Sequence, residues 1–224
     1  MVDPADREFI YVGDPMCSWC WGFAPVVSEL EASFDLPIRV VVGGLRPGDR
    51  AQLLDERLRS YLARHWTQIA DRTGQPFDSA ALDRENWIYD TMVPDAAIVT
   101  MRNVAPGETL RFFERVQRAF YAEGVDVTDP SVYRELVSGL PVDADEFVET
   151  LGSAGTQRDT YADFAEARAL GVSGFPTLLL RTGDSATPVA LGYSPYATVA
   201  ERAHSLLEAT DHRATGSLEG STAG

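Results

Sequence analysis

Residues 14–23 read Asp-Pro-Met-Cys-Ser-Trp-Cys-Trp-Gly-Phe, and this stretch contains both cysteines of the chain, Cys17 and Cys20. It follows a short β-branched run that ends at Gly13 and precedes a segment with helical apolar spacing that begins near Ser18. Cysteines this close together close too small a loop for a disulfide to stabilise the fold appreciably. We therefore expect the pair to serve chemistry rather than stability.

The pattern around this motif predicts an α/β fold. Four short apolar runs have the length and composition of strands: 8–13, 37–43, 177–181 and 189–193. A helical segment, 18–34, joins the first two runs, so those strands are expected to be parallel. The last two runs are close enough to form a hairpin, and a final helix is expected to end near residue 209. Together these parts compose a thioredoxin fold.

The residues between the two halves carry helical apolar stripes and no convincing strand pattern. The predicted fold is therefore a thioredoxin fold with a large all-helical insertion. We expect residues 5–48 and 171–209 to form the thioredoxin-fold domain and residues 49–170 to form the inserted helical domain. The small and polar residues 210–224 are expected to be a disordered tail.

Composition excludes several classes of function. The formal net charge of −15 disfavours binding to nucleic acids and to anionic membranes. No apolar run approaches the roughly 20 residues that a membrane-spanning helix needs. The N-terminus lacks the basic and apolar segments of a secretory signal, so a cytoplasmic location is expected. The three histidines are not paired at ligand spacing, which argues against a metal site within one chain.

The position of the motif at the start of a helix favours a reactive thiol at Cys17. A helix N-terminus carries partial positive charge and unpaired N–H groups, and both stabilise a thiolate. Cys20 lies one turn later, where we expect it to be more buried and to resolve a mixed disulfide formed by Cys17. Two inert core cysteines are the alternative interpretation.

A second feature precedes the third predicted strand, where residues 171–177 read Gly-Val-Ser-Gly-Phe-Pro-Thr. A cis peptide at Phe175–Pro176 would give a tight turn into that strand, and an ordinary trans turn is the alternative. The cis form would leave the backbone of Phe175 free to pair with an extended partner peptide. Trp19 and Trp21 are expected to add an apolar platform for that partner, with core packing as the alternative.

These features resemble the DsbA-like branch of the thioredoxin superfamily, and in particular bacterial predicted protein-disulfide isomerases that carry the signature at 14–23. The loop at 43–48 and the segment 172–177 match that pattern too, and the resemblance covers essentially residues 5–209.

The resemblance implies a helical insertion, a cis proline at Pro176 and no bound cofactor. It also implies that Cys17 is the nucleophile and Cys20 the resolving thiol. Periplasmic DsbA has proline and histidine between its cysteines, where this chain has Ser18 and Trp19. Tryptophan cannot supply the positive charge of a histidinium, so we expect a less oxidising pair than in periplasmic DsbA.

The leading functional expectation is a thiol–disulfide oxidoreductase or isomerase that acts on protein or peptide thiols and disulfides, with glutathione as a further candidate partner. One alternative is a glutathione-dependent enzyme of the kappa-class transferase or 2-hydroxychromene-2-carboxylate isomerase kind. The presence of both Cys17 and Cys20 argues against it, because those enzymes use a serine or a lone thiol. The other alternative is a non-enzymatic peptide-binding or chaperone module, which needs no cysteine.

Overall fold

The computed structural model describes the backbone of residues 7–219 and the side chains of residues 7–211. The strands are β1 (Arg7–Gly13), β2 (Ile38–Val42), β3 (Gln52–Leu53), β4 (Ile88–Tyr89), β5 (Thr177–Thr182) and β6 (Ser185–Leu191). The α-helices are α1 (Ser18–Ser33), α2 (Glu56–Thr73), α3 (Met92–Val104), α4 (Thr109–Tyr121), α5 (Tyr133–Leu136), α6 (Ala144–Leu151), α7 (Ala154–Ala169) and α8 (Tyr196–Glu219). Short 3-10 turns are η2 (Gly48–Arg50), η3 (Ser79–Leu82), η4 (Pro106–Glu108) and η5 (Pro130–Val132).

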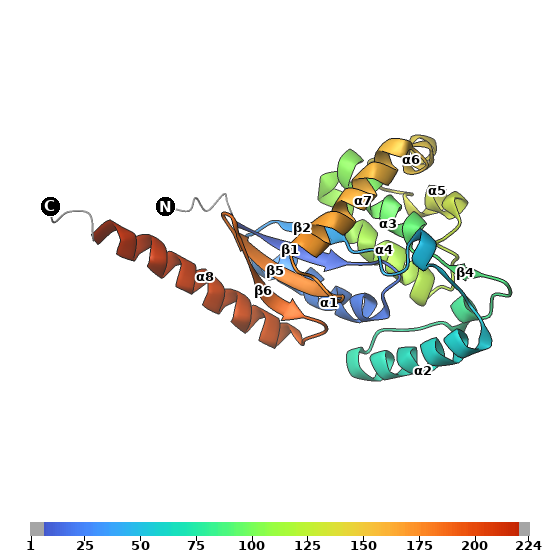
Figure 1. Cartoon of the computed structure of the whole chain (residues 1–224), viewed down its shortest axis with the longest axis horizontal. Coiled ribbons are helices and arrows are strands. Elements are labelled where there is room, and N and C mark those ends of the chain that lie inside the picture. The colour runs from blue at the N-terminus through green and yellow to red at the C-terminus, as the bar shows by residue number, and fades with distance from the viewer. Residues whose placement is uncertain (1–6, 220–224) are drawn as a thin grey trace.

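The main sheet has the strand order β2-β1-β5-β6 (Figure 1). β1 and β2 are parallel, with Phe9 opposite Ile38, and β5 runs antiparallel to β1. β5 and β6 form a hairpin. The predicted parallel pair, hairpin and thioredoxin fold are therefore confirmed, and the strands come from both ends of the chain.

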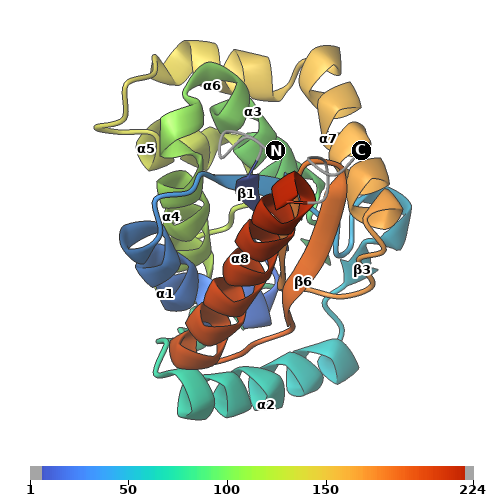
Figure 2. The same cartoon turned by 90° about the vertical axis from the view of Figure 1, so that its left-hand side faces the viewer.

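Alternation of side chains along β1 divides the core into two layers. Phe9 and Tyr11 point to the face that α1 and α8 cover, where Phe9 packs edge-on against Phe34 just after α1. Figure 2 looks onto α8 as it crosses this face, with α1 beside it. Ile10 and Val12 point to the opposite face, which is covered by α7. The strand is hydrophobic throughout because both of its faces are buried.

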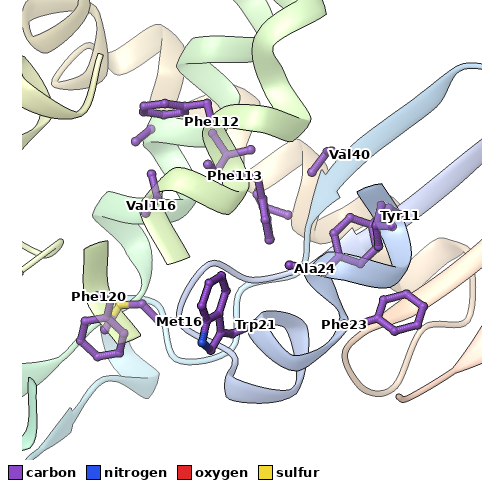
Figure 3. Packing of buried hydrophobic residues seen from close by; sticks show 14 of the residues in the cluster. Tyr11, Met16, Trp21, Phe23, Ala24, Val40, Phe112, Phe113, Val116 and Phe120 are labelled. Carbon is purple, nitrogen blue, oxygen red and sulfur yellow. The ribbon is translucent and has the colours of Figure 1, made fainter. Parts of the chain in front are cut away.

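The larger apolar layer continues without interruption from the sheet into the helical segment (Figure 3). Tyr11 of β1 packs edge-on against Phe113 of α4, with ring centroids 5.5 Å apart. Trp21 of α1 stacks on Tyr121 of α4. The predicted division into a thioredoxin-fold domain and an inserted domain stays a prediction, since the two parts share this core.

An ion pair between a buried carboxylate and a partly buried guanidinium covers the outer edge of the sheet at β2. Arg102 of α3 donates two hydrogen bonds to Asp163 of α7, at 2.7 and 2.8 Å. The same two side chains occupy the unpaired backbone groups of the edge strand: Asp163 accepts from the Val42 N–H, and Arg102 donates to the Val40 carbonyl. An edge strand with unpaired N–H and C=O groups would otherwise invite pairing with another chain.

A proline within α1 creates another contact between the sheet and the helical segment. Pro25 has no N–H, so the carbonyl of Trp21, four residues earlier, lacks its helical partner. The side chain of Gln75, which follows α2, donates to that carbonyl at 2.9 Å. The next residue, Pro76, accepts a hydrogen bond from the Trp21 indole at 2.9 Å. Trp21 of α1 therefore makes two hydrogen bonds to the segment that follows α2.

Two predictions about the helical parts need correction. β3 and β4 form a two-residue antiparallel ladder inside the insertion, which is therefore not all-helical, and so short a ladder shows no strand period in the sequence. Residues 210–219, predicted as part of a disordered tail, continue α8. Extending a packed helix is easier than starting one, and Asp211 pairs with Arg7 at the start of β1.

The predicted domain start at residue 5 and the last tail residues, 220–224, lie outside the described residues. Within residues 7–219, the structure contains no helix with the length and hydrophobicity required to cross a lipid bilayer.

We predict that Asp163→Asn lowers the free energy of unfolding by about 3 kcal/mol, because removal of one partner of a buried ion pair leaves the other charge uncompensated. Denaturant unfolding would measure the loss. The matched control is Asp145→Asn, since Asp145 pairs with Arg134 on the surface, and it should cost less than about 1 kcal/mol. Equal effects of the two substitutions would contradict the role assigned to the buried pair.

Candidate active site

Cys17 occupies the N-cap position of α1, directly after the turn that follows β1. Its backbone is extended (φ −86°, ψ 114°), its N–H donates to the Asp14 carbonyl, and its own carbonyl accepts from the Trp21 N–H. No side chain caps the helix, and its first turn contains no acidic residue. The positive end of the helix dipole is therefore not neutralised where it meets the Cys17 thiol.

The segment before β5 lies against this thiol. The Phe175–Pro176 peptide is cis, as predicted, and the Cys17 Sγ lies 3.8 Å from the Phe175 carbonyl oxygen, in position to donate to it. The tertiary structure thus brings together Cys17, Phe175 and Pro176. Cys17 is 7% exposed, and it lines a cavity of about 430 Å³.

Cys20 lies fully buried behind Cys17, as the position one turn later predicts. Burial raises the pKa of the Cys20 thiol well above its usual value, and the neighbouring Cys17 adds to the shift. A Cβ atom on Gly13 would lie 3.3 Å from the Cys20 sulfur and 3.1 Å from the Tyr11 hydroxyl, so glycine leaves these groups room to approach. Burial also raises the pKa of Tyr11. Both groups are thus neutral in the dithiol form.

The backbone of Met16, the residue before the nucleophile, is held by three hydrogen bonds. The Met16 N–H donates to Asp14 Oδ1 at 2.8 Å. Its carbonyl accepts from the hydroxyls of Tyr89 and Tyr121, which come from β4 and α4. Neither tyrosine was predicted from the sequence as part of the site. No local signal could have found them, because each lies far along the chain from the motif.

Asp14 also connects the motif to the loop after β2. Its Oδ2 accepts from the Leu45 N–H at 2.7 Å, so one buried carboxyl group spans both segments. Burial raises the pKa of Asp14, whereas hydrogen bonds from Leu45, Met16, Thr91 and Asp95 oppose the shift.

The carboxyl group of Asp95, in α3, lies behind this arrangement. Burial raises the pKa of Asp95 well above its usual value, and the Asp14 charge and their shared hydrogen bond raise it further. Of the two carboxyl groups, Asp95 therefore holds its proton more tightly than Asp14. Asp95 also accepts from the Thr91 hydroxyl. No feature of the local sequence distinguished Asp95 from an ordinary surface acid.

The two tryptophans of the motif have different environments. Trp21 is fully buried among the aromatic residues of the core, so its predicted role in substrate binding is wrong: no partner can reach it. Trp19 is half-buried and lines the cavity, packed edge-on against His65 at 5.8 Å between ring centroids. Phe175 is also half-buried and lines the cavity. Contact of Trp19 and Phe175 with a substrate stays a prediction.

Comparison with known proteins agrees with this geometry. The family model described as DSBA-like thioredoxin domain matches residues 10–203. The chain belongs to this DsbA-like family. The match includes the motif, the helical segment and the strands on both sides of it.

Solved structures of DsbA-like proteins superpose over most of the chain. A candidate protein disulfide isomerase from Nitrosomonas europaea has a TM-score of 0.83 and 30% identity, covering 91% of this chain and 98% of that one. The cytosolic disulfide reductase DsbM from Pseudomonas aeruginosa has a TM-score of 0.75 and 28% identity, covering 89% and 98%. A structure of DsbM with GSH has a TM-score of 0.68 at the same identity, covering 79% and 89%.

A curated relative is the ClpXP adapter protein SpxH of Halalkalibacterium halodurans. It is 24% identical over an alignment of 171 residues that covers 74% of this chain and 56% of SpxH. The DsbA-like chain thus spans about half the length of this relative.

The pair Asp14–Asp95 predicts a pH dependence of stability. The folded protein keeps the Asp95 proton at pH values where the unfolded chain releases it, so this group makes the protein less stable as pH rises above about 4. Asp95→Asn removes that effect, while the amide oxygen can still accept from the Thr91 hydroxyl. We expect the variant to gain stability relative to the parent between pH 5 and 8, by up to about 1.4 kcal/mol per pH unit.

Denaturant unfolding at several pH values would measure this gain. Asp83→Asn, at an exposed position, is the control and should show a much smaller pH-dependent difference. A stability difference for Asp95→Asn that is constant across pH would contradict the raised pKa of Asp95.

The loop glycine at 43 is predicted to be essential for the geometry around Cys17. A Cβ atom there would lie 2.0 Å from the Phe175 ring, so the ring, which lines the cavity in front of Cys17, must shift. We expect Gly43→Ala to slow the reaction of Cys17 with a small disulfide by roughly tenfold to a hundredfold. Gly107→Ala is the control, because a Cβ at Gly107 meets nothing within 4 Å. Equal rates in both variants would show that the contact is unimportant.

Proposed function

We propose that this DsbA-like protein catalyses thiol–disulfide exchange on protein or peptide disulfides through Cys17 and Cys20. The observation that carries the proposal is the position of the Cys17 sulfur, between the positive end of α1 and the carbonyl of Phe175, with Cys20 buried behind it. The cavity in front of Cys17 gives a partner access to it. Trp19 and Phe175 supply apolar surface for that partner.

The exchange proceeds in two steps. The Cys17 thiolate attacks one sulfur of the substrate disulfide, forms a mixed disulfide and releases the other substrate sulfur as a thiolate. Cys20 then loses its proton and attacks the Cys17 sulfur, which releases the second substrate thiol and leaves a Cys17–Cys20 disulfide. Because burial raises the pKa of Cys20, it remains a thiol until the mixed disulfide forms in front of it. The reverse sequence would oxidise a substrate dithiol.

We infer that the protein works in the cytoplasm and reduces disulfides. Isomerisation would proceed through the same mixed-disulfide intermediate. DsbM, 28% identical over most of both chains, is a cytosolic disulfide reductase. After each turnover, a reductase needs an external thiol that reduces the Cys17–Cys20 disulfide back to the dithiol form. Glutathione is the candidate for this role, and the structure of DsbM with GSH supports it.

A second candidate function is that of a non-enzymatic adapter. The curated relative SpxH is a ClpXP adapter, which favours this alternative. An adapter requires a docking surface and no reactive thiol. A glutathione-conjugating activity is disfavoured, because Cys20 is built into the core directly behind Cys17.

We predict that Cys20→Ser accumulates mixed disulfides on Cys17, because the resolving attack is lost. Non-reducing electrophoresis followed by mass spectrometry would detect them. Cys17→Ser is the matched control: it retains one thiol, but that thiol is buried, so no mixed disulfide should form and disulfide reductase activity should be abolished. If Cys17→Ser retained every measurable function, the adapter would be the correct assignment.

A further inference from the structure

The cavity in front of Cys17 contains an unusual concentration of positive charge. Arg46 and Arg50 reach it from the loop after β2, and Arg168 reaches it from the last turn of α7. No residue lining this cavity is acidic, although the chain has 34 acidic and 19 basic residues. The cavity is therefore a positive site on a molecule with a strongly negative net charge.

These charges are not neutralised within the described part of the protein. None of the ion pairs between its side chains includes Arg46, Arg50 or Arg168. Several other arginines do form such pairs, including Arg102, whose partner is Asp163. The cavity arginines thus keep their charge available for a ligand.

Two of the three arginines are held in place by contacts that leave their charge free. Arg46 donates to the side chain of Gln52 at 3.0 Å and lies over the ring of Tyr89, 4.8 Å from its centroid. Arg50 donates to the Gly44 carbonyl at 2.7 Å. Such contacts limit the side-chain entropy that would be lost when an anion binds. The third, Arg168, is exposed.

We propose that this cavity is a binding site for a small thiol or disulfide that carries carboxylate groups, and that Arg46, Arg50 and Arg168 select it by charge. Guanidinium groups bind carboxylates through paired hydrogen bonds. A volume of about 430 Å³ lies within the range of small-molecule sites and suits a ligand the size of a short peptide. The ligand sulfur meets Cys17 while its carboxylates meet the arginines.

This inference rests on the proposed exchange reaction and adds the charge of the partner and the residues that recognise it. The overall net charge of −15 repels an anionic ligand from most of the surface. A locally positive cavity reverses that effect only at the reactive thiol. Neutral and cationic disulfides lack the carboxylates that the arginines would bind.

The test is the rate at which the reduced protein is oxidised by three disulfides of different charge: glutathione disulfide, bis(2-hydroxyethyl) disulfide and cystamine. Each rate is divided by the rate at which free mercaptoethanol reacts with the same disulfide. This removes differences in intrinsic reactivity among the disulfides. We expect the normalised rate for glutathione disulfide to exceed that for cystamine by about tenfold or more, and to fall as salt is added.

Arg168→Gln and Arg50→Gln should each slow the reaction with glutathione disulfide by roughly tenfold, as expected for loss of one charged hydrogen-bonding group. The rate with the neutral disulfide should fall much less, because that disulfide loses no carboxylate contact, so the ratio of the two rates in each variant reports the charge selection. Arg202→Gln, which removes an exposed arginine from α8, is the control for a general charge effect and should leave all rates unchanged.

Equal normalised rates for the three disulfides, or variants that slow all of them alike, would overturn the proposed charge selection while leaving the exchange reaction intact. If none of the disulfides oxidises the protein, the exchange reaction itself is refuted, and the ligand assignment fails with it.

Discussion

The carboxyl group of Asp14 is the contact on which the reactive end of the molecule depends. It accepts hydrogen bonds from the Met16 N–H within the motif and from the Leu45 N–H in the loop after β2. A buried carboxylate that loses such donors is strongly destabilised, so the two segments cannot separate easily. This constraint fixes where α1 begins and therefore where Cys17 lies. Asp95 completes the arrangement by holding a proton rather than a second charge.

The helical segment supports the reaction as well as covering the sheet. Tyr89 and Tyr121 hold the Met16 carbonyl, and Gln75 fills the hydrogen-bonding position that Pro25 leaves empty in α1. The Arg102–Asp163 pair closes the edge of β2. An exchange site must present its nucleophile without allowing the strand–helix junction to move. Contacts from both sides of the junction provide that rigidity.

Burial and charge give the Cys17 and Cys20 sulfurs different roles in the exchange. Cys20 and the Tyr11 hydroxyl lie in a closed, neutral interior, where ionisation is unfavourable. Cys17 faces a cavity whose charged side chains are arginines, and burial lowers the pKa of the His65 imidazole beside them. A partner therefore meets one reactive sulfur in a positive environment, and the second sulfur acts only after the first has formed a bond.

Local sequence determined the strands of the sheet, the helix after the motif, the two cysteines and the turn at Pro176. Each of these depends on neighbouring residues, whose spacing and backbone preferences can be read directly. The tertiary structure alone decided that Trp21 is core and Trp19 lines the cavity, because helix positions two residues apart face different surroundings. It also decided the roles of Tyr89, Tyr121 and Asp95 and the extension of α8 past residue 209. These depend on contacts between residues far apart in the chain, and such contacts leave no periodic signal in the sequence.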